Sequence, residues 1–268
     1  MKFYIRLLIQ LSVLVVTPPC YVIGEDAYGD PLPVGAIASL GTIRFQLRDR
    51  PAGLYWSSDN SLIAIYYSVA LGAGRPGIQI MNVDTGRTET TPILEYNEYE
   101  DLAWGPYRQE LATCEPSGTI RIWDRRKKWR HRVFASGVST CQCIAWSPDG
   151  ATLAIGTSSS GVQLRDVSTG KIKGEIPGPA QRIAFSSDGT HLIIAGERTV
   201  SAYSMPNDSA APNGITDPIF IYNTQTGQQT HEFSGHSQMI RDLKFLPGSR
   251  LISASQDSTA LVWDLSNQ

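Results

Sequence analysis

The sequence contains few of the residues from which metal and catalytic sites are usually built. It has four cysteines and four histidines in 268 residues, with neither a His-Glu-x-x-His nor a Cys-x-x-Cys pattern. Its formal net charge of -2 indicates neither a nucleic-acid nor a membrane-surface partner. One long apolar run, residues 7–16, is shorter than the about 20 apolar residues of a membrane-spanning helix. We therefore expect no catalytic residue, no bound metal and no cofactor.

The apolar run instead predicts a signal peptide at residues 1–24. Two positive charges precede it, and small residues near Gly24 suit cleavage before Glu25. Lipid attachment at Cys20 is an alternative, although Pro19 replaces the small residue that such processing needs, and an uncleaved membrane anchor is another. The favoured interpretation is an exported protein, periplasmic or extracellular, with no membrane insertion after cleavage.

A repeated pattern fills the rest of the chain. Five apolar strand-like runs end in a similar way, and an aromatic residue followed by a polar turn precedes each run. The residues just before the final Asp or Asn are separated by 42, 42, 57 and 41 residues, which matches the ~40–45 residues of a four-stranded propeller blade plus one insertion. These residues are Met81, Trp123, Arg165, Tyr222 and Trp263.

The third unit shows why the pattern predicts four strands. Residues 141–146 alternate in polarity, and Ser147–Gly150 has the Pro, Asp and Gly of a tight turn. Residues 153–157 and 162–167 return as further strands. The last run, 171–176, carries lysines, as exposed sheet edges often do.

The chain resembles the WD-repeat (WD40) β-propeller family, on the strength of these five units and of the Trp-Asp pairs at Trp123-Asp124 and Trp263-Asp264. The resemblance implies an all-β fold, with about five four-stranded blades over residues 41–268. The last unit lacks a fourth strand, and we expect residues 42–47 to supply it and close the ring. Residues 25–40 form a lead-in, and residues 26–45 are similar to the lead-in of exported bacterial WD-repeat proteins.

The resemblance also implies a polar network that only the last unit carries whole. It combines Gly235-His236, a serine at 253 or 255, Asp257 and Trp263. Blade 5 is therefore expected to be the most stable blade, while the others depend more on apolar contacts.

Candidate binding residues lie on one face of the expected propeller, here called the top face. Connections from the second to the third strand, and from the fourth strand to the next blade, open on it. Two of them are long, 68–76 and 197–218, and long loops on rigid scaffolds often bind partners. We take Arg75, Tyr203 and Met205 as candidate contacts; tolerated insertions are the alternative.

The basic segment 125–132 permits two interpretations. One is a site for an anionic partner, with Trp129 as a stacking anchor among cations. The favoured one is a turn that leads into an exposed outer strand and keeps the sheet edge soluble.

Three cysteines would remain after cleavage: Cys114, Cys141 and Cys143. An oxidising compartment permits one disulfide, between Cys114 and one of the other two. The favoured interpretation is that all three are small buried apolar residues.

The resemblance implies a non-enzymatic scaffold that binds a protein or peptide through its top face, without nucleic acid. The alternative is an exported propeller that binds, or hydrolyses, a small molecule or carbohydrate. That alternative requires acidic or histidine side chains to converge near the channel mouth. A third possibility is a fragment of a larger propeller.

Overall fold

The chain divides into two compact units, Met1–Gln46 and Leu47–Gln268. The computed structural model describes residues 51–67, 77–83, 85, 87–89, 99–107, 109–138, 141–158, 160–196 and 217–265, all in the second unit. The predicted signal peptide, lead-in and closing strand lie outside these residues. So do three candidate contacts, Arg75, Tyr203 and Met205.

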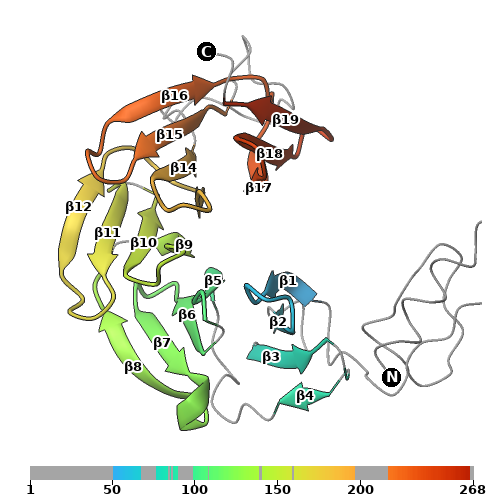
Figure 1. The fold of residues 1–268 in the computed structure, drawn as a ribbon, viewed down its shortest axis with the longest axis vertical. Helices are drawn as coiled ribbons and strands as arrows, with labels where there is room; N and C mark the ends of the chain where they lie inside the picture. The colour runs from blue at the N-terminus through green and yellow to red at the C-terminus, as the bar shows by residue number, and fades with distance from the viewer. Residues whose placement is uncertain are drawn as a thin grey trace, which may run out of the picture. The chain divides into compact units, whose positions relative to one another are not determined.

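The described residues form five antiparallel sheets in chain order (Figure 1). Four sheets have four strands each, and the fifth has three described strands. Blade 1 consists of β1 (Pro51–Trp56), β2 (Leu62–Tyr67), β3 (Gly77–Asn82) and β4 (Thr88–Glu89). Blade 2 consists of β5 (Asp101–Trp104), β6 (Glu110–Cys114), β7 (Ile120–Asp124), the 3₁₀ turn η1 (Arg125–Lys127) and β8 (Arg130–Ala135). Blade 3 consists of β9 (Cys141–Trp146), β10 (Thr152–Thr157), β11 (Val162–Asp166) and β12 (Ile172–Ile176). Blade 4 consists of β13 (Arg182–Phe185), β14 (His191–Ala195), β15 (Ile219–Asn223) and β16 (Gln229–Phe233). Blade 5 consists of β17 (Ile240–Leu246), β18 (Arg250–Ser255) and β19 (Ala260–Asp264).

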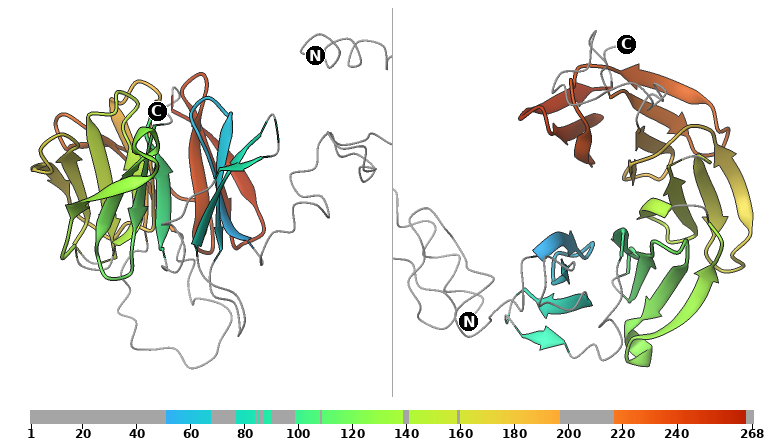
Figure 2. Two further views of the ribbon diagram at one scale, coloured as in Figure 1. Left: turned by 90° about the horizontal axis from the view of Figure 1, so that it is seen from below. Right: turned by 180° about the vertical axis from the view of Figure 1, so that it is seen from behind.

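This architecture is an all-β propeller of five blades, which confirms the predicted fold class. Within each four-stranded blade the strands follow one another from the inner to the outer side, as the views from the side and from behind also show (Figure 2). The expected fourth strand of blade 5 falls outside the described residues, so ring closure through residues 42–47 stays a prediction.

Hydrophobic clusters hold successive blades together. One cluster lies between blades 1 and 2, and three more join blades 2 and 3, 3 and 4, and 4 and 5. Leu62, Leu111, Ile155 and Leu192 are among their fully buried members. A blade of about 40 residues buries its apolar faces only against its neighbours, and these clusters are those shared faces.

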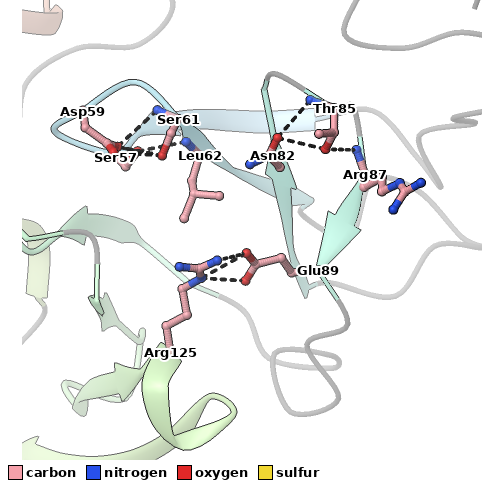
Figure 3. A network of polar contacts seen from close by, with 9 residues as sticks. All are labelled: Ser57, Asp59, Ser61, Leu62, Asn82, Thr85, Arg87, Glu89 and Arg125. Atoms are coloured by element: carbon pink, nitrogen blue, oxygen red, sulfur yellow. Dashed lines mark hydrogen bonds and ion pairs between the residues drawn. The ribbon is translucent and has the colours of Figure 1, made fainter.

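A serine and an aspartate shape the turn between the first and second strands. In blade 3, the Ser147 hydroxyl donates to Asp149 Oδ1 at 2.5 Å and accepts from the Thr152 amide at 2.9 Å. Blades 1 and 4 repeat this arrangement, and the Ser57 turn appears in Figure 3. Gly150 takes a left-handed conformation, φ 72°, which glycine adopts without strain.

The Asp or Asn that ends the third strand of blades 1 to 4 also has a structural role. Each side chain accepts a hydrogen bond from a backbone amide two or three residues later, at 2.8–2.9 Å. This fixes the turn into the fourth strand, which is the usual role of Asp and Asn in tight turns. The four residues are Asn82, Asp124, Asp166 and Asn223.

The tryptophans that precede the polar turns connect neighbouring blades. Trp104 Nε1 donates to the Tyr55 carbonyl at 2.8 Å, and Trp146 Nε1 donates to the Ala103 carbonyl at 3.1 Å. The repeated aromatic residue therefore fixes the spacing of adjacent inner strands and buries apolar surface at the same time.

Candidate functional site

The polar network of blade 5 is assembled around His236. Its Nε2 lies 2.7 Å from Ser253 Oγ, and its Nδ1 lies 2.9 Å from Asp257 Oδ2. Trp263 Nε1 donates to the same Ser253 oxygen at 2.8 Å. A Cβ at Gly235 would lie 2.8 Å from the Trp263 ring, so only glycine fits before the histidine. The structure thus brings together the predicted network residues and selects Ser253 over Ser255.

This Ser253–His236–Asp257 chain has the connectivity of a hydrolytic triad but lacks access. His236 is 0 % exposed and Ser253 is 1 % exposed. The serine oxygen also accepts the Trp263 indole hydrogen, which engages one of its two lone pairs. A substrate carbonyl cannot approach a sealed oxygen, and geometry is what identifies a triad. The arrangement therefore serves the fold.

The same network fastens two top-face connections to each other. His236 lies between β16 and β17, whereas Asp257 lies between β18 and β19. Asp257 Oδ2 also accepts from the Ser237 amide at 3.0 Å, and Oδ1 accepts from the amide and the hydroxyl of Thr259. Side-chain hydrogen bonds, with Thr259 first and His236 also among them, hold the pKa of Asp257 below its usual value. An ionised Asp257 thus stabilises this part of the top face.

Blade 2 carries a reduced version of the network. Trp123 Nε1 donates to Thr113 Oγ1 at 3.0 Å, where Thr113 takes the place of Ser253. Asp124 holds the next turn through the Arg126 amide. Its pKa is lowered by hydrogen bonds from Arg126 and Lys127, which outweigh the opposing effect of burial. The Trp-Asp pair is therefore a structural element in this blade.

A second polar cluster lies on the inner strands, and sequence reasoning did not find it. Asp101 Oδ2 on β5 accepts from the Ile144 amide of β9 at 2.9 Å. The same carboxyl forms a hydrogen bond with Tyr55 of β1 and interacts electrostatically with Arg182 of β13. Arg182 Nε in turn donates to the Arg241 carbonyl of β17 at 2.7 Å. Five strands of five blades therefore meet in one set of polar contacts.

Burial dominates the electrostatics of this cluster. It raises the pKa of Asp101 to about 6, against the effect of its hydrogen bonds and of Arg182. Burial and the nearby Asp101 also raise the pKa of Tyr55, and burial raises that of the Cys143 thiol. Each blade has an aromatic residue just before the polar turn, and the position three residues earlier is the same in each blade. In blades 2 to 5 this position is occupied by Asp101, Cys143, Arg182 and Asp242. Recognising that shared position was the one available sequence signal.

Trp129 is not a surface anchor, and that candidate assignment was wrong. It is 3 % exposed and packs edge-on against Trp104, with ring centroids 6.0 Å apart. Lys128 and Trp129 both have positive φ, 55° and 59°, and this reversal turns the indole inward. The favoured interpretation of the basic segment agrees with the structure, which places a turn before the exposed strand β8.

The cysteines depart from the favoured interpretation. Cys114 of β6 and Cys141 of β9 form a disulfide that links blades 2 and 3. Cys143 is the buried free thiol, and it contacts the Ala180 carbonyl at 3.4 Å. Cys141 packs in the cluster between blades 2 and 3, whereas Cys143 packs between blades 3 and 4. The apolar interpretation therefore holds for Cys143 alone.

Neither a metal-binding group nor a membrane-spanning helix occurs in the part of the chain that the structure describes. Within it, no three His, Cys, Asp or Glu side chains are grouped so as to hold a metal ion. No helix in the same residues has the length and apolarity to cross a membrane.

Two family models match the chain. The model described as WD domain, G-beta repeat matches residues 227–264, which include the blade 5 network. The model described as Anaphase-promoting complex subunit 4 WD40 domain matches residues 102–183, which include blades 2 and 3. The chain therefore contains WD40 repeats. Neither match includes residues 26–45, so the similarity to exported bacterial proteins stays a prediction.

Curated relatives are WD-repeat proteins of greater length. Nuclear distribution protein PAC1 from Coccidioides posadasii is 29 % identical over 59 % of this chain and 35 % of its own length. Anaphase-promoting complex subunit cdc20 from Dictyostelium discoideum is 26 % identical over 81 % of this chain and 42 % of its own. WD repeat-containing protein 18 from Danio rerio is 25 % identical over 55 % of this chain and 33 % of its own length. The chain spans about a third to two fifths of these relatives.

A solved structure agrees on the fold. A chain in the crystal structure of the Mitotic Checkpoint Complex matches with a TM-score of 0.60 at 19 % identity. The match covers 80 % of this chain and 62 % of that one. At this identity the likeness concerns the propeller fold alone.

Proposed function

We propose that this WD40-repeat propeller is a non-enzymatic platform that binds a protein or peptide partner through its top face. The observation that carries the proposal is the network of His236, Ser253 and Asp257, which locks two top-face connections together. Polar groups that could do chemistry are used there to fix loops. A preformed surface binds with a smaller loss of conformational entropy, which favours recognition by shape and a few buried anchors.

Further hydrogen bonds across the same face support a preformed surface. The Gln256 amide donates to the Met239 carbonyl at 3.0 Å, and the Ala180 amide donates to the Thr157 carbonyl at 2.9 Å. Each joins a connection between blades to a turn between the second and third strands. Rigid loops around an exposed face are a common basis for protein binding in repeat proteins.

Names of similar proteins are consistent with assembly into complexes. The Dictyostelium relative is named as a subunit of the anaphase-promoting complex, and the matching solved structure is of a mitotic checkpoint complex. We extend from these only the class of function, binding of proteins, because this chain covers a part of each. Its own partner is to be identified by experiment.

The binding site that we propose includes the two long top-face connections, 68–76 and 197–218. Arg75, Tyr203 and Met205 supply a cation, an aromatic ring and a flexible apolar side chain, residue types suited to protein interfaces. These residues lie outside the described part of the chain, so the assignment rests on sequence.

We also propose that the protein is exported. The sequence of residues 1–24 has the pattern of a signal peptide. The disulfide between Cys114 and Cys141 supports this location, because disulfides persist in oxidising compartments and are rare in the cytosol.

The test uses the mature protein with residues 204–214 replaced by a short Gly-Ser linker. Cross-linking in an extract of the exported fraction, followed by mass spectrometry, should identify a partner for the unmodified protein. The replacement should abolish this cross-link and leave the melting temperature nearly unchanged, since long surface loops contribute little to stability. The matched control is Tyr107→Ala, which alters an exposed side chain in a turn on the opposite face. Loss of the cross-link in both variants, or in neither, would refute the top-face assignment.

A further inference from the structure

The outer edge of blade 2 carries a concentrated positive charge on a chain whose formal net charge is -2. We call this surface the basic edge, defined by the exposed basic side chains of η1, of β8 and of the two residues between them. Arg126 and Lys127 have side chains 65 % and 73 % exposed. Its members are Arg126, Lys127, Lys128, Arg130 and Arg132.

Carboxylates neutralise only part of this charge. Asp124 forms ion pairs with both Arg126 and Lys127, at 3.2 and 3.4 Å. Within the described residues, no carboxylate lies within ion-pair distance of the other three members, Lys128, Arg130 and Arg132. The basic edge therefore keeps an excess of positive charge that an anionic partner can neutralise.

Contacts with neighbouring residues and blades fix the position of the basic edge. Buried Trp129 anchors the turn between Lys128 and Arg130, and Arg125 binds Glu89 of blade 1 through two nitrogens (Figure 3). Arg132 Nη2 donates to the Val167 carbonyl of blade 3 at 2.8 Å. A fixed backbone with exposed cations presents its charge at a smaller entropic cost than a flexible tail would.

The backbone of β8 forms the open edge of its sheet. The strand order is β5-β6-β7-β8, and no other described strand pairs with the far side of β8. Val133, in the same strand, is 56 % exposed. His131 packs on the Trp123 ring. Its pKa is lowered, mainly by burial and also by the positive charge of Arg121, so it adds no charge at pH 7.

A comparison with the other outer strands shows that solubility alone does not require this charge. β12 combines a lysine with a glutamate, and β16 combines a histidine with a glutamate. β8, with the sequence RHRVFA, has two arginines and no acid. All three are exposed edges, and two of them have no concentration of positive charge, so protection from unwanted pairing does not require one.

We infer that the basic edge is a second binding surface, which takes an extended acidic segment of a partner protein as an additional strand beside β8. The backbone edge supplies hydrogen-bond donors and acceptors, the cations select acidic side chains, and Val133 offers an apolar contact. This surface is separate from the proposed top-face site. The edge favours a peptide over nucleic acid, because base or phosphate groups cannot continue a β-sheet ladder.

The probe for this inference is a fluorescent peptide of alternating Glu and Val, titrated into the mature protein. We expect saturable binding that weakens strongly between about 0.05 M and about 0.5 M salt. The variant Lys128→Glu/Arg130→Glu should bind at least about tenfold more weakly, since two attractive charges become repulsive. The matched control, Lys171→Glu/Lys173→Glu on the edge of blade 3, makes the same charge change and should alter binding less than about twofold.

Three outcomes would overturn the inference. One is equal weakening by the control pair, which would indicate a response to total charge. Another is undiminished binding of a peptide methylated on every backbone nitrogen, since such a peptide has no amide hydrogen to donate to the edge of β8. The third is binding of a DNA oligonucleotide or of anionic lipid vesicles in place of the peptide. Unchanged melting temperatures would establish that each variant is folded.

Discussion

Blades 3 and 5 share a strand order but differ in what surrounds them. Blade 3 has four strands and contributes to two hydrophobic clusters, one on each face. Blade 5 has three described strands and contributes to one cluster, against blade 4. Yet blade 5 holds the complete His236 network, and blade 3 has no histidine in the corresponding connection. A comparison of the two blades therefore distinguishes stabilisation by packing against neighbouring blades from stabilisation by a local polar network.

Burial favours blade 3. In β10 five of the six residues are buried, including Ile155, whereas β18 alternates between buried and exposed positions. The third strand of blade 5, β19, has no buried residue, and Val262 is 58 % exposed. Apolar burial stabilises by about 25 cal/mol per Å², so a larger shared apolar surface outweighs a few hydrogen bonds of about 1 kcal/mol each. The sequence-based expectation that blade 5 is the most stable therefore needs a direct test.

The largest expected effect concerns the disulfide, which blade 3 has and blade 5 lacks. Cys114 and Cys141 are separated by 27 residues, and a cross-link of that span stabilises by about 3 kcal/mol in the loop-entropy account. Reductant should lower the free energy of unfolding of the wild-type protein by about that amount. Denaturant titration with and without reductant measures it.

The control for this prediction is Cys143→Ala, which leaves the disulfide intact. This variant should respond to reductant as the wild type does, whereas Cys141→Ala should not respond. A wild-type protein of equal stability in both conditions would show that the blade 2–blade 3 contact does not depend on the cross-link.

The next prediction compares one substitution in both blades. Ile155→Ala removes a fully buried side chain between blades 2 and 3 and should cost about 3 kcal/mol, since it leaves a cavity. Ile252→Ala, in the second strand of blade 5, removes a partly exposed side chain that belongs to none of the four clusters and should cost less than about 1 kcal/mol. Chemical denaturation of both variants gives the difference. Equal losses would mean that Ile252 is packed as closely in solution as Ile155.

The structure also shows which features sequence reasoning can reach. The five units, the turns and the residues His236, Asp257 and Trp263 follow from local patterns, because the physics that fixes them acts within one blade. The direction of Trp129 could not be predicted, since it depends on two successive residues with positive φ.

Contacts between side chains of different blades could not be predicted from the sequence either. Asp101 meets the Ile144 amide and Arg182 only because three inner strands converge. The pairing of Cys114 with Cys141 depends on the register of neighbouring sheets. Periodicity reveals that blades pack together, but it does not reveal which side chains meet.

A third prediction addresses the network of blade 5. His236→Ala removes one hydrogen bond from buried Ser253 and one from Asp257, and it should cost about 2 kcal/mol. The loss should be local, so we expect faster hydrogen exchange at the Ser237 amide, which donates to Asp257. His231→Ala, on outer strand β16, is the matched control and should leave that amide protected. Exchange that speeds up equally in blade 3 would show that the network stabilises the whole propeller.

The smallest effects are expected from pH, and they have opposite signs at two carboxyl groups. Burial raises the pKa of Asp101, which is bonded to blade 3, to about 6 from 3.8. The folded state therefore binds more protons than the unfolded state between about pH 4 and about pH 6, and this group makes stability fall as pH rises through that window. Asp101→Asn keeps an oxygen for the Ile144 amide and should remove about 1 to 3 kcal/mol of that fall. Unfolding free energies at a series of pH values provide the measurement.

Asp257 of blade 5 supplies the opposing case. Its folded pKa is lowered, so its contribution is present above about pH 4 and is lost on further acidification. Asp257→Asn should therefore flatten the acid side of the stability profile and leave the slope between about pH 4 and about pH 6 intact, whereas Asp101→Asn should do the reverse. Two variants with the same profile would mean that the carboxyl groups respond to the net charge of the chain. Profiles of opposite kind would show that inner-strand burial sets the pH response of the contact between blades 2 and 3, and that loop hydrogen bonds set that of blade 5.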